Sequence, residues 1–189
     1  MITGIIMASG FSKRMNKDKL TLDFKGISIV ERVIKAVKQS NIDEIILVYR
    51  EEKIKEIAIK NRIKAVYNDK AQLGQSESIK LGINASSIET KGFMFFVGDQ
   101  PFLEPCTINK LIDTFNKKNT DIVVPIYKDK RGNPVIFSFK LKDELLKIEG
   151  DKGGKSIITK KYNDVEFVFF DNNIARLDID TWDEYLKWR

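Results

Sequence analysis

Short apolar runs alternate with amphipathic stretches along the 189 residues of this chain. The apolar runs predict buried strands at 2–8, 44–49, 63–67, 93–97, 121–126 and 165–170. The amphipathic stretches predict helices at 28–39, 51–61, 76–85, 105–117, 141–148 and 154–161, and a closing helix that begins near Asp180. Residues 127–139 are expected to form a hairpin that turns near 130–133. Strands that alternate with helices in this way are typical of an α/β fold.

Local signals support this assignment. Ser28 and Glu31 have the spacing of a capping box at a helix start, and Pro105 suits the first turn of a helix. The run at 93–97 is apolar on both faces, as in a central parallel strand. Successive strand–helix units predict a three-layer, Rossmann-like α/β fold with a mostly parallel central sheet and a small hairpin excursion. Because no repeat or linker interrupts the pattern, we expect residues 1–189 to form a single domain.

Ligands of such sheets bind at the carboxyl ends of the strands, near the point where the strand order reverses. In this chain that rule selects two loops, residues 8–19 after the first predicted strand and residues 98–104 after the strand at 93–97. We therefore expect the chemistry of the protein to be found in these two loops.

The composition narrows that chemistry. The sequence has no histidine, which excludes Ser-His-Asp and Cys-His triads and the common zinc sites. The net charge of +6 fits a nucleic acid or a small polyanion as partner, or only a lysine-rich genome. A lone Cys106 fits a reducing cytoplasm, where we expect the protein to reside. The longest uncharged stretch, residues 1–12, is too short to span a membrane.

The first loop has the features of an anion site. Ala8, Ser9 and Gly10 are small enough for backbone N–H groups to approach an anion, and Arg14 and Lys19 supply positive charge. The loop matches neither the Walker A nor the GxGxxG pattern. A solvated basic turn is the alternative interpretation.

The second loop offers a carboxylate. Asp99 follows the most hydrophobic strand, where it could bind Mg²⁺, or else close a turn or cap the next helix. Near the C-terminus, Asp178 and Asp180 alternate with apolar residues and are expected to point to the same side. One of them could complete a metal site with Asp99, and the other could cap the final helix.

Taken together, the sequence M-A-S-G-F-S-K-R-M with K-L five residues after Arg14, then G-D-Q-P at 98–101 and D-I-D-T at 178–181, resembles the nucleotidyltransferases with a GT-A-like Rossmann domain. Within these it is most similar to the molybdenum cofactor cytidylyltransferases and their guanylyltransferase relatives. The matching positions of the opening motif are Ala8, Gly10, Ser12, Arg14, Met15, Lys19 and Leu20. The spacing of Arg14 and Lys19 is that of the cytidylyl branch.

Further matches to this family follow in order along the chain: Asn68, residues 74–79, residues 132–137 and residues 150–155. The sequence departs from the family at Ser9, where the cytidylyl branch has Ala and the guanylyl branch Gly, and at Asn16, Gly154–Lys155 and Trp182. The changes at Ser9 and Asn16 bear on the choice of nucleotide, and the change at 154–155 bears on the acceptor.

The resemblance implies transfer of CMP from CTP to the terminal phosphate of a molybdopterin-type molybdenum cofactor, with Mg²⁺ as cofactor and pyrophosphate as product. It implies catalytic roles for Arg14, Lys19 and Asp99, and a metal site at Asp99 and Asp178. The implied nucleotide-binding residues are Ala8, Ser9, Gly10, Ser12, Arg14, Lys19, Asn68, Gly74, Gln75, Ser76 and Asp99. The implied acceptor-binding residues are Gln100, Pro101, Gly132, Asn133, Pro134, Gly150, Asp151 and Gly153. A phosphate nucleophile is largely ionised at neutral pH, so the lack of histidine is compatible with this reaction.

Other functions remain open at this stage. The enzyme could use GTP, or a sugar or polyol phosphate as acceptor. It could be a basic nucleic-acid-binding domain, although no interleaved aromatic platform supports this. It could also deliver the cofactor without catalysis, and the product could pass to a molybdoenzyme or its chaperone. No membrane partner is expected.

Overall fold

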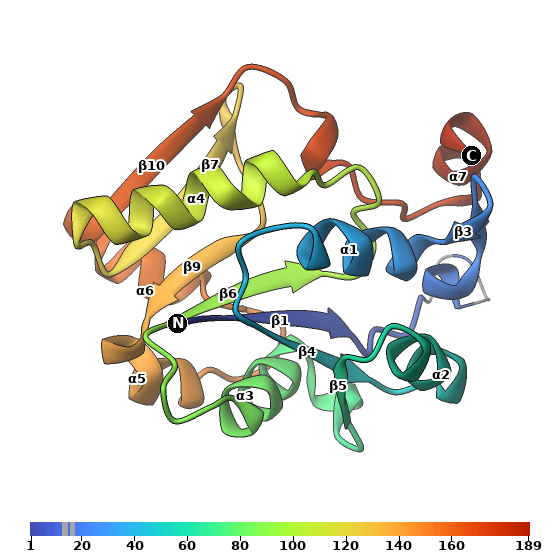
Figure 1. Cartoon of the computed structure of the whole chain (residues 1–189), viewed down its shortest axis with the longest axis horizontal. Coiled ribbons are helices and arrows are strands. Elements are labelled where there is room, and N and C mark those ends of the chain that lie inside the picture. Colours follow the sequence, from blue (N-terminus) through green and yellow to red (C-terminus); the bar gives the residue numbers. More distant parts are fainter. Residues whose placement is uncertain (13–14, 16–17) are drawn as a thin grey trace.

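The computed structural model describes residues 1–12, 15 and 18–189, and it contains a central sheet with helices on both faces (Figure 1). The sheet has the strand order β10-β7-β9-β6-β1-β4-β5, and β8 pairs with β7. The strands are β1 (Ile2–Ala8), β4 (Glu44–Tyr49), β5 (Lys64–Tyr67), β6 (Gly92–Val97), β7 (Ile122–Tyr127), β8 (Lys130–Arg131), β9 (Val135–Ser138) and β10 (Val165–Phe170). Because β8 and β9 alone pair antiparallel in this sheet, the prediction of a mostly parallel sheet is confirmed.

The helices form two layers. They are α1 (Ile29–Lys38), α2 (Glu52–Lys60), α3 (Gln75–Ala85), α4 (Pro105–Lys118), α5 (Lys142–Leu146), α6 (Lys155–Lys160) and α7 (Trp182–Trp188). One hydrophobic cluster joins α1, α2 and α4 to the sheet, and a second joins α3, α5 and α6 to the opposite face. No described helix is both long and apolar enough to cross a membrane.

Side-chain alternation in the central strands explains the two layers. In β6, Met94 and Phe96 belong to the first cluster, whereas Phe93 and Phe95 belong to the second. Successive side chains of a strand point to opposite faces, so a strand that is apolar at every position can hold helices on both sides. The sequence pattern at 93–97 therefore correctly predicted a central strand.

The chain order places a topological switch point beside β1. From β1 the chain proceeds to β4 and β5 on one side, and then crosses to β6 on the other side. At the carboxyl ends of β1 and β6, the Gly98 N–H donates a hydrogen bond to the Met7 carbonyl at 3.1 Å. The two loops selected from the sequence therefore start from neighbouring strands.

Three local predictions need correction. Residues 23–28 form a small hairpin, β2 (Asp23–Phe24) and β3 (Ile27–Ser28), whose turn residues Lys25 and Gly26 both have positive φ. This is the conformation of the tightest hairpin turns, and strands of two residues are too short to give a periodic signal. At the start of α1, Ser28 Oγ accepts from the Glu31 N–H, but the Glu31 carboxylate contacts Lys60 at 3.3 Å instead of completing the box.

The third correction concerns the hairpin expected at 127–139. The chain does return antiparallel along β7, first as β8 and then as β9, but it turns at 128–129 instead of 130–133, and β9 lies between β6 and β7. A cis peptide bond joins Asn133 to Pro134 just before β9. The long-range pairing of β9 with β6 decides this arrangement, and local turn signals contain no information about it.

Candidate active site

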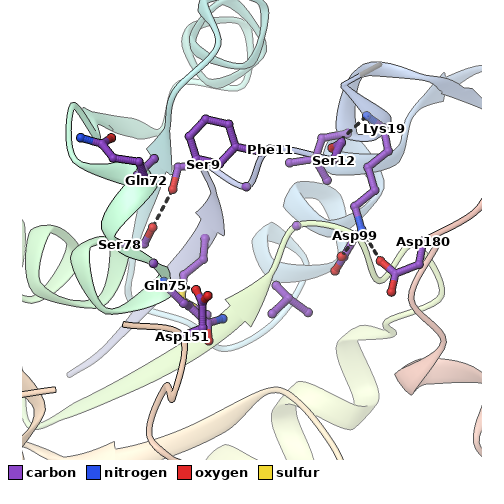
Figure 2. A pocket seen from close by; sticks show the side chains of 17 residues that line it. Ser9, Phe11, Ser12, Lys19, Gln72, Gln75, Ser78, Asp99, Asp151 and Asp180 are labelled. Carbon is purple, nitrogen blue, oxygen red and sulfur yellow. Dashed lines mark hydrogen bonds and ion pairs between the residues drawn. The ribbon is translucent and has the colours of Figure 1, made fainter. Parts of the chain in front are cut away.

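A pocket of about 960 Å³ opens at the switch point, where β1 and β6 end (Figure 2). Its lining residues come from the end of β1 and the loop after it, the segment before α3 and the first turn of α3, the end of β6 and the loop after it, and two later positions, Asp151 and Asp180. They are Met7, Ser9, Gly10, Phe11, Ser12, Lys19, Leu20, Ala71, Gln72, Gly74, Gln75, Ser78, Val97, Gly98, Asp99, Asp151 and Asp180. The expectation that ligands bind at strand ends thus corresponds to an actual cavity.

One end of the pocket is charged. The Lys19 Nζ lies 2.6 Å from Asp99 Oδ2 and 2.6 Å from Asp180 Oδ1, and Figure 2 shows both carboxylates turned toward the ammonium group. The backbone helps to assemble this charged end, because the Ile179 N–H donates to the Asp99 carbonyl at 3.1 Å. Asp18 caps the short helical turn Lys19–Thr21 by accepting from the Leu20 N–H at 3.1 Å. The ammonium group of Lys19 therefore joins three segments that are distant in sequence.

The charges around Lys19 keep it protonated. Burial acts to lower the pKa of Lys19, but the negative charge of Asp99 and the hydrogen bond to Asp180 outweigh it, so the pKa is raised above 10.5. The side chain is only 12% exposed. Lys19 is therefore a permanent, partly desolvated positive charge at physiological pH, suited to phosphate oxygens.

The two carboxylates also fit a divalent metal ion. Asp99 Oδ1 is buried and has no hydrogen-bond partner among the described residues, so it has an unused lone pair. Mg²⁺ and Mn²⁺ prefer oxygen ligands, and Mg²⁺ is often held by one or two carboxylates together with substrate phosphates. No group of three or more metal-ligating side chains is found in the described part of the chain, so a cation here would take its other ligands from phosphates and water.

Asp180, rather than the predicted Asp178, joins Asp99 at this end. Asp178 Oδ1 accepts a hydrogen bond of 2.7 Å from Gln100 Nε2, and Gln100 also donates to the Arg176 carbonyl at 3.2 Å. Neither Asp178 nor Gln100 lines the pocket. The two aspartates thus bind different partners, and the predicted helix-capping role falls to Thr181, which caps α7 in a complete capping box.

Asp178 has a perturbed acidity. The residue as a whole is exposed, but its carboxyl group packs among protein atoms, and this burial and the charge of Asp99 raise its pKa to about 6. The hydrogen bond from Gln100 opposes the shift without cancelling it.

The opposite end of the pocket is neutral. Asn68 Nδ2 donates to Ser9 Oγ at 3.0 Å and to Ser78 Oγ at 3.1 Å, and the two hydroxyl oxygens lie 2.7 Å apart. Ser9, Asn68 and Ser78 are 6%, 1% and 2% exposed. Ser9 and Ser78 line the pocket, whereas Asn68 supports them from behind. Ser9 and Asn68 were predicted individually from the sequence, and Ser78 lies within the predicted segment at 74–79.

The wall between the two ends joins the predicted nucleotide and acceptor loops. The Gln75 N–H donates to Asp151 Oδ1 at 3.0 Å, and the Ser76 N–H donates to the Gly150 carbonyl at 3.0 Å. Gly74 has φ +104°, and a Cβ there would lie 2.5 Å from the Gly150 carbonyl carbon, so only glycine permits this contact. Ser76 is buried and does not line the pocket.

A second pocket of about 350 Å³ lies next to the first and shares Met7 and Gln75 with it. Its floor is apolar. Its rim combines predicted acceptor residues with basic side chains: Gly132, Asn133 and Gly153 with Arg131, Lys152 and Lys155. Of the other predicted acceptor residues, Asp151 lines the first pocket, whereas Gln100, Pro101, Pro134 and Gly150 line neither.

The remaining predictions for the first loop have mixed outcomes. Gly10 and Ser12 line the first pocket, and Ser12 Oγ accepts from the Lys19 N–H at 3.3 Å, while Ala8 is buried beneath them. Arg14 lies outside the described residues.

Sequence reasoning missed Phe11 and Arg50. The Arg50 guanidinium lies 4.3 Å from the centre of the Phe11 ring, and the ring borders the pocket. Arg50 directly follows β4, so the strand-end rule, applied to that strand, could have found it.

The fold and the site combine an open, mostly parallel sheet, a pocket at its switch point and a lysine between two aspartates. The chain belongs to the family of MobA-like NTP transferase domains, whose model matches residues 4–165. The proposed resemblance to this family is confirmed at that level, while the base and the acceptor are unresolved.

Proteins that are similar to this chain carry both guanylyl and cytidylyl names. A "probable molybdenum cofactor guanylyltransferase" of Natranaerobius thermophilus is 29% identical over 126 residues, which cover 66% of this chain and 60% of that protein. A 3-deoxy-manno-octulosonate cytidylyltransferase of Rickettsia akari is 31% identical over 131 residues, which cover 67% of this chain and 52% of that protein. The matches thus span only about half to three fifths of these relatives.

Among solved structures, Rv0371c of Mycobacterium tuberculosis H37Rv superposes with a TM-score of 0.89 at 26% identity, covering 99% of this chain and 96% of that one. A manganese complex of Rv0371c superposes with a TM-score of 0.84 at 25% identity, covering 99% and 97%. The central sheet and its helices therefore match a solved fold over nearly the whole length of both chains.

Proposed function

We propose that residues 1–189 act as one nucleotidyltransferase domain that transfers CMP from CTP to the terminal phosphate of a molybdopterin-type acceptor, with Mg²⁺ as the metal ion. The observation that carries the proposal is the charged end of the pocket, where Lys19 lies 2.6 Å from both Asp99 and Asp180. A buried cation and a carboxylate oxygen with no described partner are what a triphosphate with its metal ion requires.

The reaction needs positioning and charge neutralisation more than proton transfer. An oxygen of the acceptor phosphate forms a bond to the α-phosphorus of the nucleotide, and the bond from that phosphorus to the α–β bridging oxygen breaks to release pyrophosphate. The nucleophile is already ionised, because the second pKa of a phosphomonoester is near ~6. Lys19 stabilises the negative charge that develops on the leaving group. Asp99 and Asp180 would hold the metal ion, which supplies further positive charge for the phosphates.

The second pocket supports an acceptor with a phosphate and an apolar body. Arg131, Lys152 and Lys155 on its rim can pair with phosphate oxygens, and its apolar floor suits a planar ring system. A sugar or polyol phosphate would use the same basic rim but would leave the floor uncovered.

Two features bear on which nucleoside triphosphate the enzyme uses. The five-residue spacing of Arg14 and Lys19 supports CTP, as in the cytidylyl branch that the sequence resembles. GTP is the second candidate, because relatives from Natranaerobius thermophilus and Thermococcus sibiricus carry the guanylyltransferase name. We propose that the product passes to a molybdoenzyme or its chaperone.

The test is pyrophosphate release with CTP, GTP, UTP or ATP, each with Mg²⁺ and molybdopterin-type acceptor. CTP is expected to support release that depends on the acceptor. Asp180→Asn should lower the rate strongly, whereas Asp178→Asn, a matched change two residues away, should leave it within about threefold, because only Asp180 lines the pocket. Release with no nucleotide would refute the transfer, and release with GTP alone would assign the protein to the guanylyl branch.

A further inference from the structure

The neutral end of the pocket contains more hydrogen-bonding capacity than its internal contacts use. The Asn68 amide has one orientation, because its Oδ1 accepts from the Lys70 N–H at 3.1 Å. Both of its Nδ2 protons are therefore directed to Ser9 and Ser78. The hydroxyls of these serines lie 2.7 Å apart, and either one can donate to the other.

Counting protons and lone pairs gives two equivalent states. Each hydroxyl has one proton and two lone pairs. If Ser78 donates to Ser9, the bonds from Ser78 and Asn68 fill both lone pairs of Ser9; the Ser9 proton is left over, and Ser78 keeps one free lone pair. If Ser9 donates to Ser78 instead, the Ser78 proton is left over and Ser9 keeps one free lone pair. Among the described residues neither hydroxyl has a further partner, so the pair always offers one donor and one acceptor.

The two serines that hold the unused donor and acceptor line the part of the pocket where a nucleobase would lie. Both serines line the first pocket and are at most 6% exposed. Figure 2 shows them at the end opposite Lys19, Asp99 and Asp180, where the phosphates are expected. A base extending from those phosphates would meet the hydroxyl pair, and a polar group left unpaired in a buried wall is unfavourable.

We propose that Ser9 and Ser78, positioned by Asn68, read the exocyclic group of the base, at position 4 of a pyrimidine or position 6 of a purine, with reversible polarity. An amino base such as cytosine or adenine meets the pair in one state, and a keto base such as uracil or guanine meets it in the other. These hydroxyls therefore do not enforce CTP, and the nucleotide class of the site includes both amino and keto bases. The proposal rests on the proposed function only in that the first pocket binds a nucleoside triphosphate.

The first experiment measures nucleotide binding with Mg²⁺ and without acceptor, by calorimetry. CTP is compared with UTP, and ATP with GTP, so that ring size is constant within each pair. We expect dissociation constants within about tenfold in each pair, and binding about two- to tenfold weaker for the pyrimidin-2-one ribonucleoside triphosphate, which lacks the 4-substituent. A difference above about a hundredfold in either pair, or an analogue that binds as tightly as CTP and UTP, would overturn the proposal.

The second experiment uses Asn68→Asp to fix the direction in which the two serine hydroxyls donate. The new carboxylate can accept both hydroxyl protons, so only lone pairs remain for the base, and amino bases should be favoured. The CTP-to-UTP affinity ratio is expected to rise by about tenfold. The added negative charge repels every triphosphate alike, so the ratio is insensitive to it. Ser86→Ala, at the end of α3 where the hydroxyl bonds only to the Ile83 carbonyl, is the control and should leave the ratio unchanged.

If Asn68→Asp does not fold, Ser9→Ala replaces it. The remaining Ser78 hydroxyl still offers a donor and an acceptor, so both CTP and UTP should bind more weakly by similar factors. An unchanged ratio in Asn68→Asp, or a strongly changed ratio in Ser9→Ala, would contradict the reversible pair. Nucleotide binding in the expected pattern without pyrophosphate release would refute the proposed transfer instead, so the two failures can be distinguished.

Discussion

The two ends of the pocket both bring together separate parts of the chain, yet they differ in the charge of their buried polar groups. At the neutral end, Ser9, Asn68 and Ser78 are almost fully buried and bonded to one another. At the charged end, the Asp180 side chain is 38% exposed, and Asp99 keeps one buried oxygen without a described partner. The hydrogen bonds within the neutral cluster contribute to stability, although one donor and one acceptor stay unused, whereas a buried carboxylate oxygen without a described partner is a larger cost that a ligand can offset. The comparison indicates that changes at the charged end should affect rate, and changes at the neutral end should affect stability.

Asp99→Asn gives the largest expected effect and tests the charged end directly. The change keeps the shape of the side chain but removes its charge, so we expect kcat to fall by about 10³-fold. The melting temperature should change little, because the side chain is partly exposed. Steady-state pyrophosphate release and thermal melting measure the two effects, with Asp113→Asn, an exposed aspartate of α4, as control. Normal metal-dependent activity in Asp99→Asn would refute the role of this carboxylate.

Lys19→Met should have the next largest effect. It removes a positive charge that its two carboxylate partners keep protonated, and we expect kcat to fall by about 10²-fold. The relative affinities for different bases should not change, because Lys19 is at the other end of the pocket from Ser9 and Ser78. Single-turnover kinetics with each nucleotide measure both quantities, with Lys117→Met as an exposed control. A changed base preference in Lys19→Met would show that the two ends do not act separately.

Asn68→Ala should affect stability more than rate, which is the reverse of the two charged-end variants. Loss of the amide removes the three hydrogen bonds that it makes to Ser9, Ser78 and the Lys70 N–H, and it leaves the two serine hydroxyls buried with one partner fewer. We expect the free energy of unfolding to fall by about 2 kcal/mol, while kcat falls less than in either charged-end variant. Urea denaturation measures the change, and Asn116→Ala, an exposed position in α4, is the control. A larger effect on rate than on stability would break the comparison.

The smallest expected effect is a pH dependence near the charged end. The pKa of Asp178 rises from 3.8 to about 6 on folding, so between these values the folded protein binds more protons than the unfolded chain. Stability should therefore fall as the pH rises from about 4 to about 6, and then level off. Asp178→Asn cannot ionise and should lack this contribution. Urea denaturation from pH 4.5 to 7 measures the free energy of unfolding of both proteins, and the difference between the two pH profiles is the contribution of Asp178. If the two profiles run parallel, Asp178 does not have the raised pKa.

Much of this architecture could be predicted from local patterns. The strands at 2–8, 44–49 and 165–170 match the observed bounds, because buried strands need unbroken apolar runs. The loops after β1 and β6 were selected correctly, since the carboxyl ends of parallel strands meet at one edge of the sheet. The β2–β3 hairpin was missed because strands of two residues have no measurable period.

The candidate site could likewise be predicted only in part from the sequence. Lys19 and Asp99 could be named from the sequence, but the choice between Asp178 and Asp180 could not, because it depends on Gln100 taking one and Lys19 the other. The serine pair is a similar case. Ser9 and Ser78 both lie in segments that match the family, but they are 69 residues apart, and only the structure shows that their hydroxyls are hydrogen-bonded.

The sequence by itself determined the α/β class and the two loops that line the pocket, and it excluded chemistry that depends on histidine. These follow from local periodicity and composition, which need no knowledge of contacts. Only the tertiary structure decided the insertion of β9, the pairing of Asp180 with Lys19 and the hydroxyl pair at the neutral end. Each of these depends on contacts between residues far apart in the chain, where burial and hydrogen-bond satisfaction choose among side chains that look equivalent in the sequence.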